Sequence, residues 1–227
     1  MKSLRQTFGF VLLLFASLSF IFHSAAAQND RPLVLVMTAD GPIMPPMLEY
    51  IKRGITAADR RNAEVLIIQL NTPGGNLDTM LLIIQEIRAS EAPVVVYVSP
   101  RNAIAGSAGA MITMAGHASA MAPETSIGAS SPISGSGENL DSTSAAKARE
   151  ISKAAIRDFV SPRGEEALAL AEAMIDEAKA VTAKEALEAN LVDFIVDNVD
   201  DLLESLDGFT VQMGSGPRTL RTTGADI

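Results

Sequence analysis

The sequence has no cysteine and no tryptophan, and aromatic residues make up only 4% of its 227 positions. Without cysteine the chain has no disulfide, no thiol nucleophile and no thiolate metal ligand, so its fold depends on a hydrophobic core alone. Hydrophobic residues amount to 48%, which is enough for one such core. Because aromatic residues are scarce, the core must consist of Ala, Val, Leu, Ile and Met, a composition that suits a layered α/β domain.

Basic residues are also in deficit, with 18 Lys and Arg against 27 Asp and Glu and a net charge of −9 at pH 7. A chain this acidic is a poor ligand for nucleic acid, so no nucleic-acid partner is expected. No His, Asp and Glu have metal-ligand spacing, and we interpret the acidic run 197–201 as solvated charge at a helix N-terminus. Gly74-Gly75 lacks the following residues of a phosphate or dinucleotide motif, so neither a metal nor a cofactor is expected.

Residues 1–27 have the pattern of a secretory signal peptide. Lys2 and Arg5 precede an apolar run over 8–22, and three alanines at 25–27 fit a cleavage site before Gln28. An uncleaved anchor is the alternative, but the apolar run is short for a membrane span of about 20 residues. The sequence therefore predicts an exported protein, at the periplasmic face of the inner membrane or otherwise outside the cytoplasm.

The remainder alternates between buried strands and amphipathic helices. Apolar runs at 33–37, 65–70 and 94–98 predict strands, and the 3.6-residue periodicity of 76–89 predicts a helix between two of them. Continuous apolar strands separated by helices indicate a largely parallel sheet covered on both faces.

The second half of the chain is predicted in less detail. The polar, Gly- and Ser-rich segment 134–146 is expected to be a mobile loop. Thr182 and Glu185 have the spacing of a capping box. The elements expected after residue 117 are a short strand and turn within 118–133, helices at 145–160, 164–178 and 183–189, a strand at 191–196 and a helix at 200–206. These boundaries give a domain over 28–206, followed by a weakly structured tail over 207–227.

Two glycine-containing turns point to a function. Asn71-Thr-Pro-Gly-Gly75 and Gly106-Ser-Ala-Gly109 each follow an apolar strand, and the second opens a helix of small residues. A Gly-Gly turn allows backbone amides to approach a ligand closely, and a serine in a helix-opening turn can expose its hydroxyl beside the next amide. Together these turns supply a nucleophile, Ser107, and the elements of an oxyanion hole. A turn that serves only packing is the structural alternative.

Histidine does not supply the base that such a serine needs. His23 lies in the predicted signal peptide, and His117 follows Ser107 by ten residues. The intervening helix carries the chain about 13 Å, which places His117 at the far end of that element. A Ser-His-Asp triad is therefore not expected.

A neutral lysine can act as the base when its surroundings lower its pKa. Lys147 shares a helical face with Ile151, Ala154 and Ala155, and it opens a helix directly after the polar loop. Lys153 instead has charged neighbours along its helix. The spacing favours Lys147, with a lysine that merely extends to solvent as the structural alternative.

Five stretches together resemble the ClpP/crotonase superfamily and, more closely, the protease domain of NfeD-type (nodulation efficiency protein D) membrane serine proteases. The resemblance covers about 33–206 and implies a ClpP-like α/β fold, with a largely parallel sheet, repeated ββα/βα units and flanking helices. The matching stretches are 70–78, 93–100, 105–109, 121–129 and 182–193.

This resemblance also implies the roles of the site residues. Ser107 would be the nucleophile, and Lys147, about sixteen residues before Arg163-Gly164, would complete a Ser-Lys dyad. The amides of Gly75 and Ala108 would form the oxyanion hole, and Gly74 would shape the turn. The histidine that follows the corresponding strand in ClpP is missing here, as in the branch of the superfamily that uses a lysine.

The function implied is that of an exported serine endopeptidase that needs no cofactor and cleaves apolar segments of membrane proteins, such as stomatin-like partners. ClpP-like folds usually assemble, so a homodimer or higher oligomer is expected. Full-length family members continue into membrane spans, which implies membrane association. Two alternatives remain: a signal-peptide peptidase A type hydrolase, and a non-catalytic scaffold or adaptor. A crotonase-like acyl-CoA enzyme is disfavoured because an exported domain meets little acyl-CoA.

Overall fold

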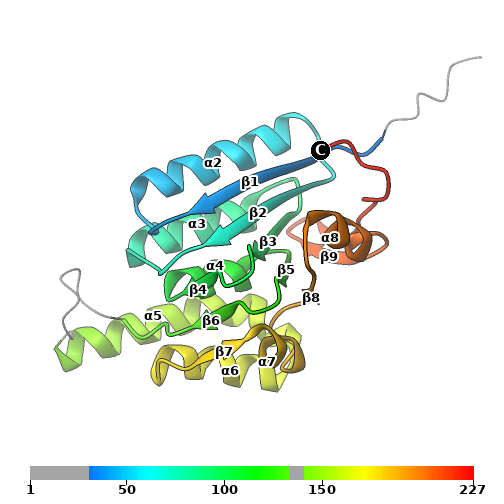
Figure 1. The fold of residues 1–227 in the computed structure, drawn as a ribbon. Coiled ribbons are helices and arrows are strands. Elements are labelled where there is room, and N and C mark those ends of the chain that lie inside the picture. Colours follow the sequence, from blue (N-terminus) through cyan, green and yellow to red (C-terminus); the bar gives the residue numbers. More distant parts are fainter. Residues whose placement is uncertain (1–30, 133–140) are drawn as a thin grey trace, which may run out of the picture. The chain divides into compact units, whose positions relative to one another are not determined.

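A five-stranded sheet in the order β1-β2-β3-β5-β8 forms the centre of the computed structural model, which describes residues 31–132 and 141–227 (Figure 1). Every neighbouring pair in this sheet is parallel, which confirms the predicted topology. The strands are β1 (Val34–Asp40), β2 (Val65–Asn71), β3 (Val94–Val98), β5 (Ala118–Met121) and β8 (Phe194–Ile195). The predicted signal peptide and most of the predicted loop at 134–146 lie outside the described residues.

Both faces of the sheet are covered, which explains why its strands are apolar throughout. On β2, Leu66, Ile68 and Leu70 pack into one hydrophobic cluster, whereas Val65 and Ile67 pack into another on the opposite face. Successive side chains of a strand point to opposite faces, so each cluster takes every second residue. The first cluster contains α2 (Pro45–Arg60), α3 (Leu77–Ala89) and α4 (Ala108–Ala115), and the second contains α8 (Val199–Leu206).

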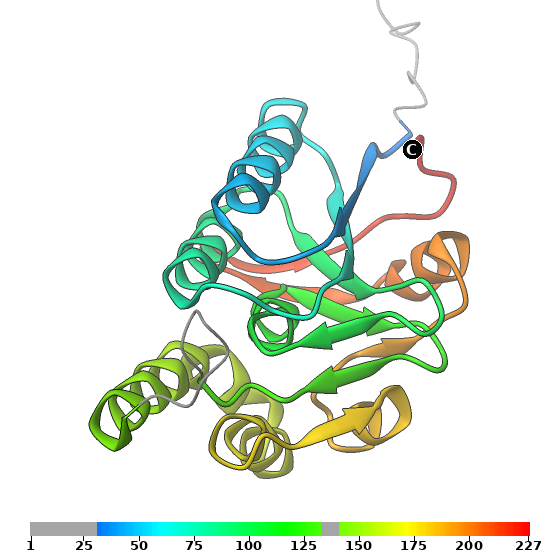
Figure 2. The same ribbon diagram turned by 60° about the vertical axis from the view of Figure 1, so that its left-hand side comes forward.

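A second, three-stranded sheet brings distant parts of the chain to the end of the first (Figure 2). Its strands are β4 (Ile104–Gly106), β6 (Ser126–Gly128) and β7 (Ala180–Thr182), in that order. Thr72, just beyond β2, forms a parallel bridge with Ala105 of β4. This bridge joins the two predicted turn motifs side by side at the carboxyl ends of parallel strands, where ligands bind in many α/β proteins.

Some of the helices after the polar loop begin at side-chain caps. Helix α5 (Ser142–Val160) starts three residues earlier than predicted, because the Asp141 carboxylate accepts hydrogen bonds from the amides of Thr143 and Ser144 at 3.0 Å. Helix α7 (Ala183–Glu188) begins with the predicted capping box of Thr182 and Glu185. Between these helices lie η1 (Ser161–Arg163) and α6 (Glu165–Asp176).

The prediction of a weakly structured tail over 207–227 is wrong. Strands β9 (Thr210–Met213) and β10 (Gly216–Thr219) form an antiparallel hairpin, and its buried residues Val211 and Met213 join the same cluster as α8. The segment then returns to β1, where the Asp226 amide donates to the Pro32 carbonyl at 2.9 Å. Burial of alternate apolar side chains is what orders this segment.

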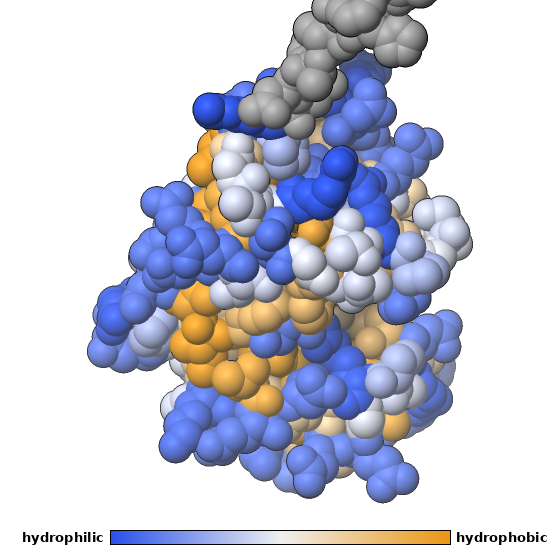
Figure 3. All heavy atoms as spheres, turned by 90° about the vertical axis from the view of Figure 1, so that its right-hand side faces the viewer, coloured by the Kyte–Doolittle hydropathy of each residue, from blue (hydrophilic) through white to orange (hydrophobic). Residues whose placement is uncertain are grey.

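The surface beside α8 and β9 is predominantly polar, with smaller apolar areas among hydrophilic residues (Figure 3). Asp197 and Asp200 are exposed there, and Asn198 caps α8 by accepting from the Asp201 amide at 3.0 Å. Within residues 31–132 and 141–227, no helix is both long and apolar enough to cross a bilayer. In the same ranges no group of three or more His, Asp and Glu side chains is arranged to hold a metal ion.

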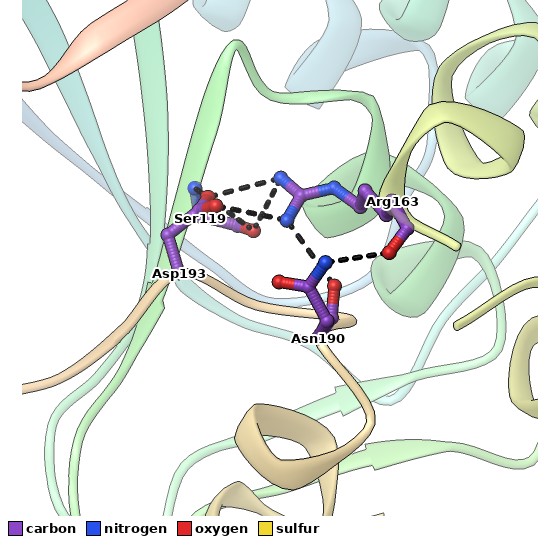
Figure 4. A network of polar contacts seen from close by, with 4 residues as sticks. All are labelled: Ser119, Arg163, Asn190 and Asp193. Carbon is purple, nitrogen blue, oxygen red and sulfur yellow. Dashed lines mark hydrogen bonds and ion pairs between the residues drawn. The ribbon is translucent and has the colours of Figure 1, made fainter. Parts of the chain in front are cut away.

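A largely buried ion pair joins η1 to the segment before β8 and to β5 (Figure 4). The Arg163 guanidinium donates to both Asp193 carboxylate oxygens at 2.9 Å, and the same carboxylate accepts from the Ser119 amide at 2.7 Å. Both charged side chains are 14% exposed. Asn190 completes the network by donating from its side chain to the Arg163 carbonyl.

Replacing Asp193 with Ala should lower the free energy of unfolding by about 3 kcal/mol, because it leaves the Arg163 cation and the Ser119 amide without their acceptor in a poorly solvated site. Denaturant-induced unfolding measures this loss. Asp197→Ala is the matched control, since Asp197 pairs with Arg101 but is 57% exposed, and it should cost less than about 1 kcal/mol. Equal losses in the two variants would contradict the structural role assigned to the buried pair.

Candidate active site

A cavity of about 720 Å³ opens where the two turn motifs meet. Pro73 and Gly75 line it from the first turn, and Ser107 and Ala108 line it from the second. Side chains of α3, α4 and α5 and the segment after β6 complete its walls. The structure therefore brings three of the predicted site residues, Gly75, Ser107 and Ala108, to one concave surface.

Ser107 has an uncommon backbone conformation between β4 and α4. Its φ of 51° and ψ of −115° lie in a region that residues with a side chain rarely adopt. Two hydrogen bonds maintain it: the Ser107 amide donates to the Gly128 carbonyl at 2.7 Å, and the Ser130 hydroxyl donates to the Ser107 carbonyl at 3.1 Å. In the described part of the chain the Ser107 hydroxyl itself has no hydrogen-bond partner. Strain of this kind is typically retained where it presents a functional group.

Gly74 and Gly75 are required by the close approach of three chain segments. Gly74 has φ of 110°, and a Cβ there would lie 2.6 Å from the Ser107 Cβ. A Cβ on Gly75 would lie 2.1 Å from the Ile43 carbonyl oxygen. Ile43 forms a parallel bridge with Gly75, donating from its amide to the Gly74 carbonyl and accepting from the Asn76 amide, both at 2.8 Å. Only glycine fits these two positions without moving backbone.

Two backbone amides beside Ser107 remain available to a ligand. Neither the Gly75 amide nor the Ala108 amide donates to any acceptor within the described ranges. Ala108 is the first residue of α4, so its amide also lies at the positive end of that helix. A free hydroxyl next to two free N–H donors is the arrangement that acyl transfer requires.

Lys147 does not line the cavity. Its side chain is exposed on α5, and the helix instead presents Ala148 and Ser152 to the cavity. The expected burial of the face containing Lys147 is not observed, because Ile151 on that face is 49% exposed. The buried residues of α5 are Ala145, Ser152, Ile156 and Val160.

Lys153 is unsuited to act as a base. Its ammonium lies 2.7 Å from a Glu150 oxygen and 3.2 Å from an Asp176 oxygen. Hydrogen bonds to Glu150 and then to Asp176 raise the pKa of Lys153 above its ordinary value, which holds the side chain as a cation.

His117 lies beyond the end of α4, as predicted, and takes no part in the cavity. The residue is 7% exposed, and Nδ1 accepts from the Val94 amide at 3.1 Å, while Nε2 has no partner among the described residues. Burial, followed by the positive charge of Arg88, lowers the pKa of His117 to about 4.

The depressed pKa of His117 should make stability fall in mild acid. The unfolded chain binds a proton near pH 6.5 and the folded one only near pH 4, so stability is full above 6.5 and declines as the pH falls to about 4. The loss should reach about 3 kcal/mol. Denaturation between pH 4 and 7 measures it. His117→Asn keeps an acceptor for the Val94 amide and should remove this component, whereas an unchanged pH dependence would contradict it.

A family model described as "NfeD1b, N-terminal domain" matches residues 33–212. The chain belongs to this family. Its curated relatives include the membrane-bound protease PH1510 of Pyrococcus horikoshii, 34% identical over 96% of this chain and 49% of the relative. Membrane protein NfeD1b of Bacillus subtilis is 28% identical over 79% of this chain and 42% of its own length. The chain thus spans about half the length of these relatives.

Solved structures agree with this assignment. A lysine-to-alanine mutant of the 1510-N membrane-bound stomatin-specific protease, in complex with a substrate peptide, superposes with a TM-score of 0.79 at 32% identity, covering 87% of this chain and 91% of that one. ClpP1 from Listeria monocytogenes has a TM-score of 0.60 at 18% identity, covering 74% and 94% of the two chains, which shows the fold alone. This chain therefore has the predicted ClpP-like α/β fold.

Sequence reasoning did not identify three residues that shape this site. Ile43 holds the Gly-Gly turn, Ser130 holds the Ser107 carbonyl, and Ser152 lines the cavity from α5. Ile43 and Ser130 act through long-range backbone contacts, which leave no local pattern. Ser152 is a polar residue within the apolar face of α5. A polar residue in such a position could have indicated that this face lines a cavity.

Proposed function

We propose that this chain is the protease domain of an exported, membrane-associated serine endopeptidase, with Ser107 as nucleophile and Lys147 as base. The observation that carries the proposal is the strained turn at Ser107, which presents an unpartnered hydroxyl beside the free amides of Gly75 and Ala108 in one cavity. The curated relative named a membrane-bound protease supports the reaction class.

In this mechanism Lys147 removes the proton from the Ser107 hydroxyl as Oγ attacks the scissile carbonyl carbon. The negative charge on the carbonyl oxygen is stabilised by the amides of Gly75 and Ala108. Lys147 then gives its proton to the leaving amine, and an ester on Ser107 remains. A water molecule, deprotonated by the same lysine, hydrolyses that ester and restores the serine.

The assignment of Lys147 has separate support. Mutants of the 1510-N protease have been made by replacing a lysine and a serine with alanine, and these positions lie 41 apart in that protein. Ser107 and Lys147 lie 40 apart here. Because Lys147 is exposed and Ala148 lines the cavity, the mechanism requires the long Lys147 side chain to reach past Ala148 into the cavity.

The walls of the cavity favour an apolar substrate. Met44, Leu77, Met80 and Met111 line it, and methionine side chains adapt to apolar groups of different shape. Together with the stomatin-specific relative, this lining supports cleavage within apolar segments of membrane proteins such as stomatin-like partners. A homodimer or higher oligomer, and membrane association of the full-length protein, are part of the same proposal.

Covalent labelling tests the proposed nucleophile. The 227-residue chain is treated with a fluorophosphonate and, separately, with a mixed library of apolar-rich synthetic peptides, and mass spectrometry locates the label and the cleaved bonds. We expect the label on Ser107 and its absence from Ser107→Ala. Peptide cleavage that persists in Ser107→Ala would exclude this serine as the nucleophile.

The exposure of Lys147 is the one observation that favours a different function, a non-catalytic scaffold or adaptor. A scaffold requires no base, so its lysine can remain in solvent. The same experiment separates the two: neither labelling nor cleavage, from a chain that unfolds cooperatively, would favour the scaffold.

A further inference from the structure

The cavity contains two hydroxyl groups that are committed to protein partners and two that are not. The Ser130 hydroxyl donates to the Ser107 carbonyl at 3.1 Å, and the Ser131 hydroxyl donates to the Ile175 carbonyl at 2.8 Å. Ser107 and Ser152 line the same cavity, but neither hydroxyl has a hydrogen-bond partner in the described ranges. The free hydroxyl of Ser107 is explained by the proposed reaction, and that of Ser152 is not.

Ser152 is buried in the wall that α5 contributes. Its residue is only 4% exposed, and it lies one helical turn after Ala148, the other α5 residue of the lining. Because this hydroxyl lines the cavity without a partner among the described residues, a ligand that fills the cavity removes it from water and loses free energy unless the ligand hydrogen-bonds to it. Helix residues often satisfy such a hydroxyl with the carbonyl four residues earlier, as Thr113 does with Gly109 at 2.8 Å, but Ser152 does not.

The walls that α3 and α4 contribute to the cavity are apolar. Leu77, Met80 and Met111 line the cavity from α3 and α4, and the lining residue Asn76 is exposed and uses its side-chain oxygen to cap α3. In the proposed reaction the amides of Gly75 and Ala108 serve the carbonyl of the scissile bond. The α5 wall is then left to the substrate side chain that enters the cavity.

We infer that Ser152 is a specificity-determining residue, whose hydroxyl bonds a hydroxyl-bearing substrate side chain, so that the cavity accepts Thr or Ser as readily as an apolar residue of the same shape. The inference rests on the proposed peptidase function. In a purely apolar pocket the substrate hydroxyl would lose its hydrogen bonds to water, which weakens binding. A pocket that offers a hydrogen-bond partner avoids this loss of free energy.

Paired peptides test this inference. The peptide that the 227-residue chain cleaves fastest in the library is resynthesised with Val or Thr, which have nearly the same shape, at each position flanking the cleaved bond in turn. For the wild type, kcat/KM for Val and Thr should be about equal at one position. In Ser152→Ala the ratio at that position should shift toward Val by about tenfold.

Ser131→Ala is the matched control, because it removes a hydroxyl from the same cavity that is already bonded to Ile175. It should leave the Val-to-Thr ratio unchanged and lower the unfolding midpoint. Ser152→Ala should not lower that midpoint, since alanine favours helix and the lost hydroxyl had no partner.

An unchanged ratio in Ser152→Ala at every position, in a protein that still requires Ser107 for cleavage, would overturn the inference and leave the peptidase intact. A wild type that cleaves no peptide, or cleavage that survives Ser107→Ala, would overturn the proposed function and this inference with it.

Discussion

Replacing either Ser107 or Lys147 with alanine should reduce peptide cleavage by at least about 10⁴-fold, with little change in stability. The serine variant lacks the attacking oxygen, and the lysine variant lacks the group that removes its proton. The two losses should not add in the double variant, because both residues act in the same step. Steady-state kinetics with the best library peptide and an unfolding curve for each variant provide the measurement.

Lys184→Ala is the control for a general effect of removing a lysine. Lys184 is 82% exposed on α7 and pairs only loosely with Glu188, at 3.7 Å. It should retain wild-type kcat/KM. If Lys147→Ala also retained wild-type kcat/KM while Ser107→Ala was inactive, Ser107 would be supported as the nucleophile. Lys147 would then be excluded as the base.

Introducing one methyl group at Gly75 should reduce kcat by about 10²- to 10³-fold, the usual cost of losing one oxyanion donor. The new Cβ would meet backbone, the Ile43 carbonyl oxygen at 2.1 Å, so the turn itself must move. That movement displaces the Gly75 amide from the space beside Ser107. The rate of fluorophosphonate labelling should fall in parallel, because that reaction also develops negative charge on an oxygen.

Gly116→Ala separates this effect from a loss of stability. Its Cβ would lie 2.6 Å from the Ala118 carbonyl oxygen, and neither residue lines the cavity, so the substitution should destabilise the fold but leave kcat per folded molecule unchanged. Labelling of Gly75→Ala at the wild-type rate would exclude its amide from the oxyanion hole.

The sheet was predictable because its strands carry long, continuous apolar runs, and such runs arise when both faces are covered. Val65 through Leu70 and Val94 through Val98 are of this kind. The two glycine turns could also be recognised from the sequence, because the close approach of backbone excludes every residue other than glycine at Gly75. The sequence thus contains the nucleophile and the turns in local patterns.

The hairpin over 210–219 was missed although its signals are present. Thr210-Val-Gln-Met213 alternates polar and apolar residues, and Gly214-Ser-Gly216 supplies a turn. With two buried side chains in β9 and none in β10, this pattern is weak beside the strong runs of the central sheet. What orders the segment is the complementary apolar face of α8, which a local reading of the sequence does not include.

The orientation of α5 was mispredicted because only the residues next to Lys147 were considered. Ile151 and Ala154, on the face of Lys147, are exposed, whereas the helix buries Ala145, Ser152, Ile156 and Val160 on another face. The apolar pattern of the whole helix therefore indicates the buried face, and the short run around Lys147 does not. The placement of Lys147 relative to the cavity depends on which face of α5 is buried.

The contact between Pro32 and Asp226 has a consequence for the topology of the domain. Since one hydrogen bond already spans the two ends of the folded unit, a linker of a few residues would convert its chain into a closed loop. The fold would then depend on the order of the helices and strands around the closed chain. It would not depend on where that closed chain is opened to give new termini. An opening at the exposed Gly214, where an added Cβ would meet no other residue within 4 Å beyond its chain neighbours, should give a permuted chain that retains the sheet and the cavity.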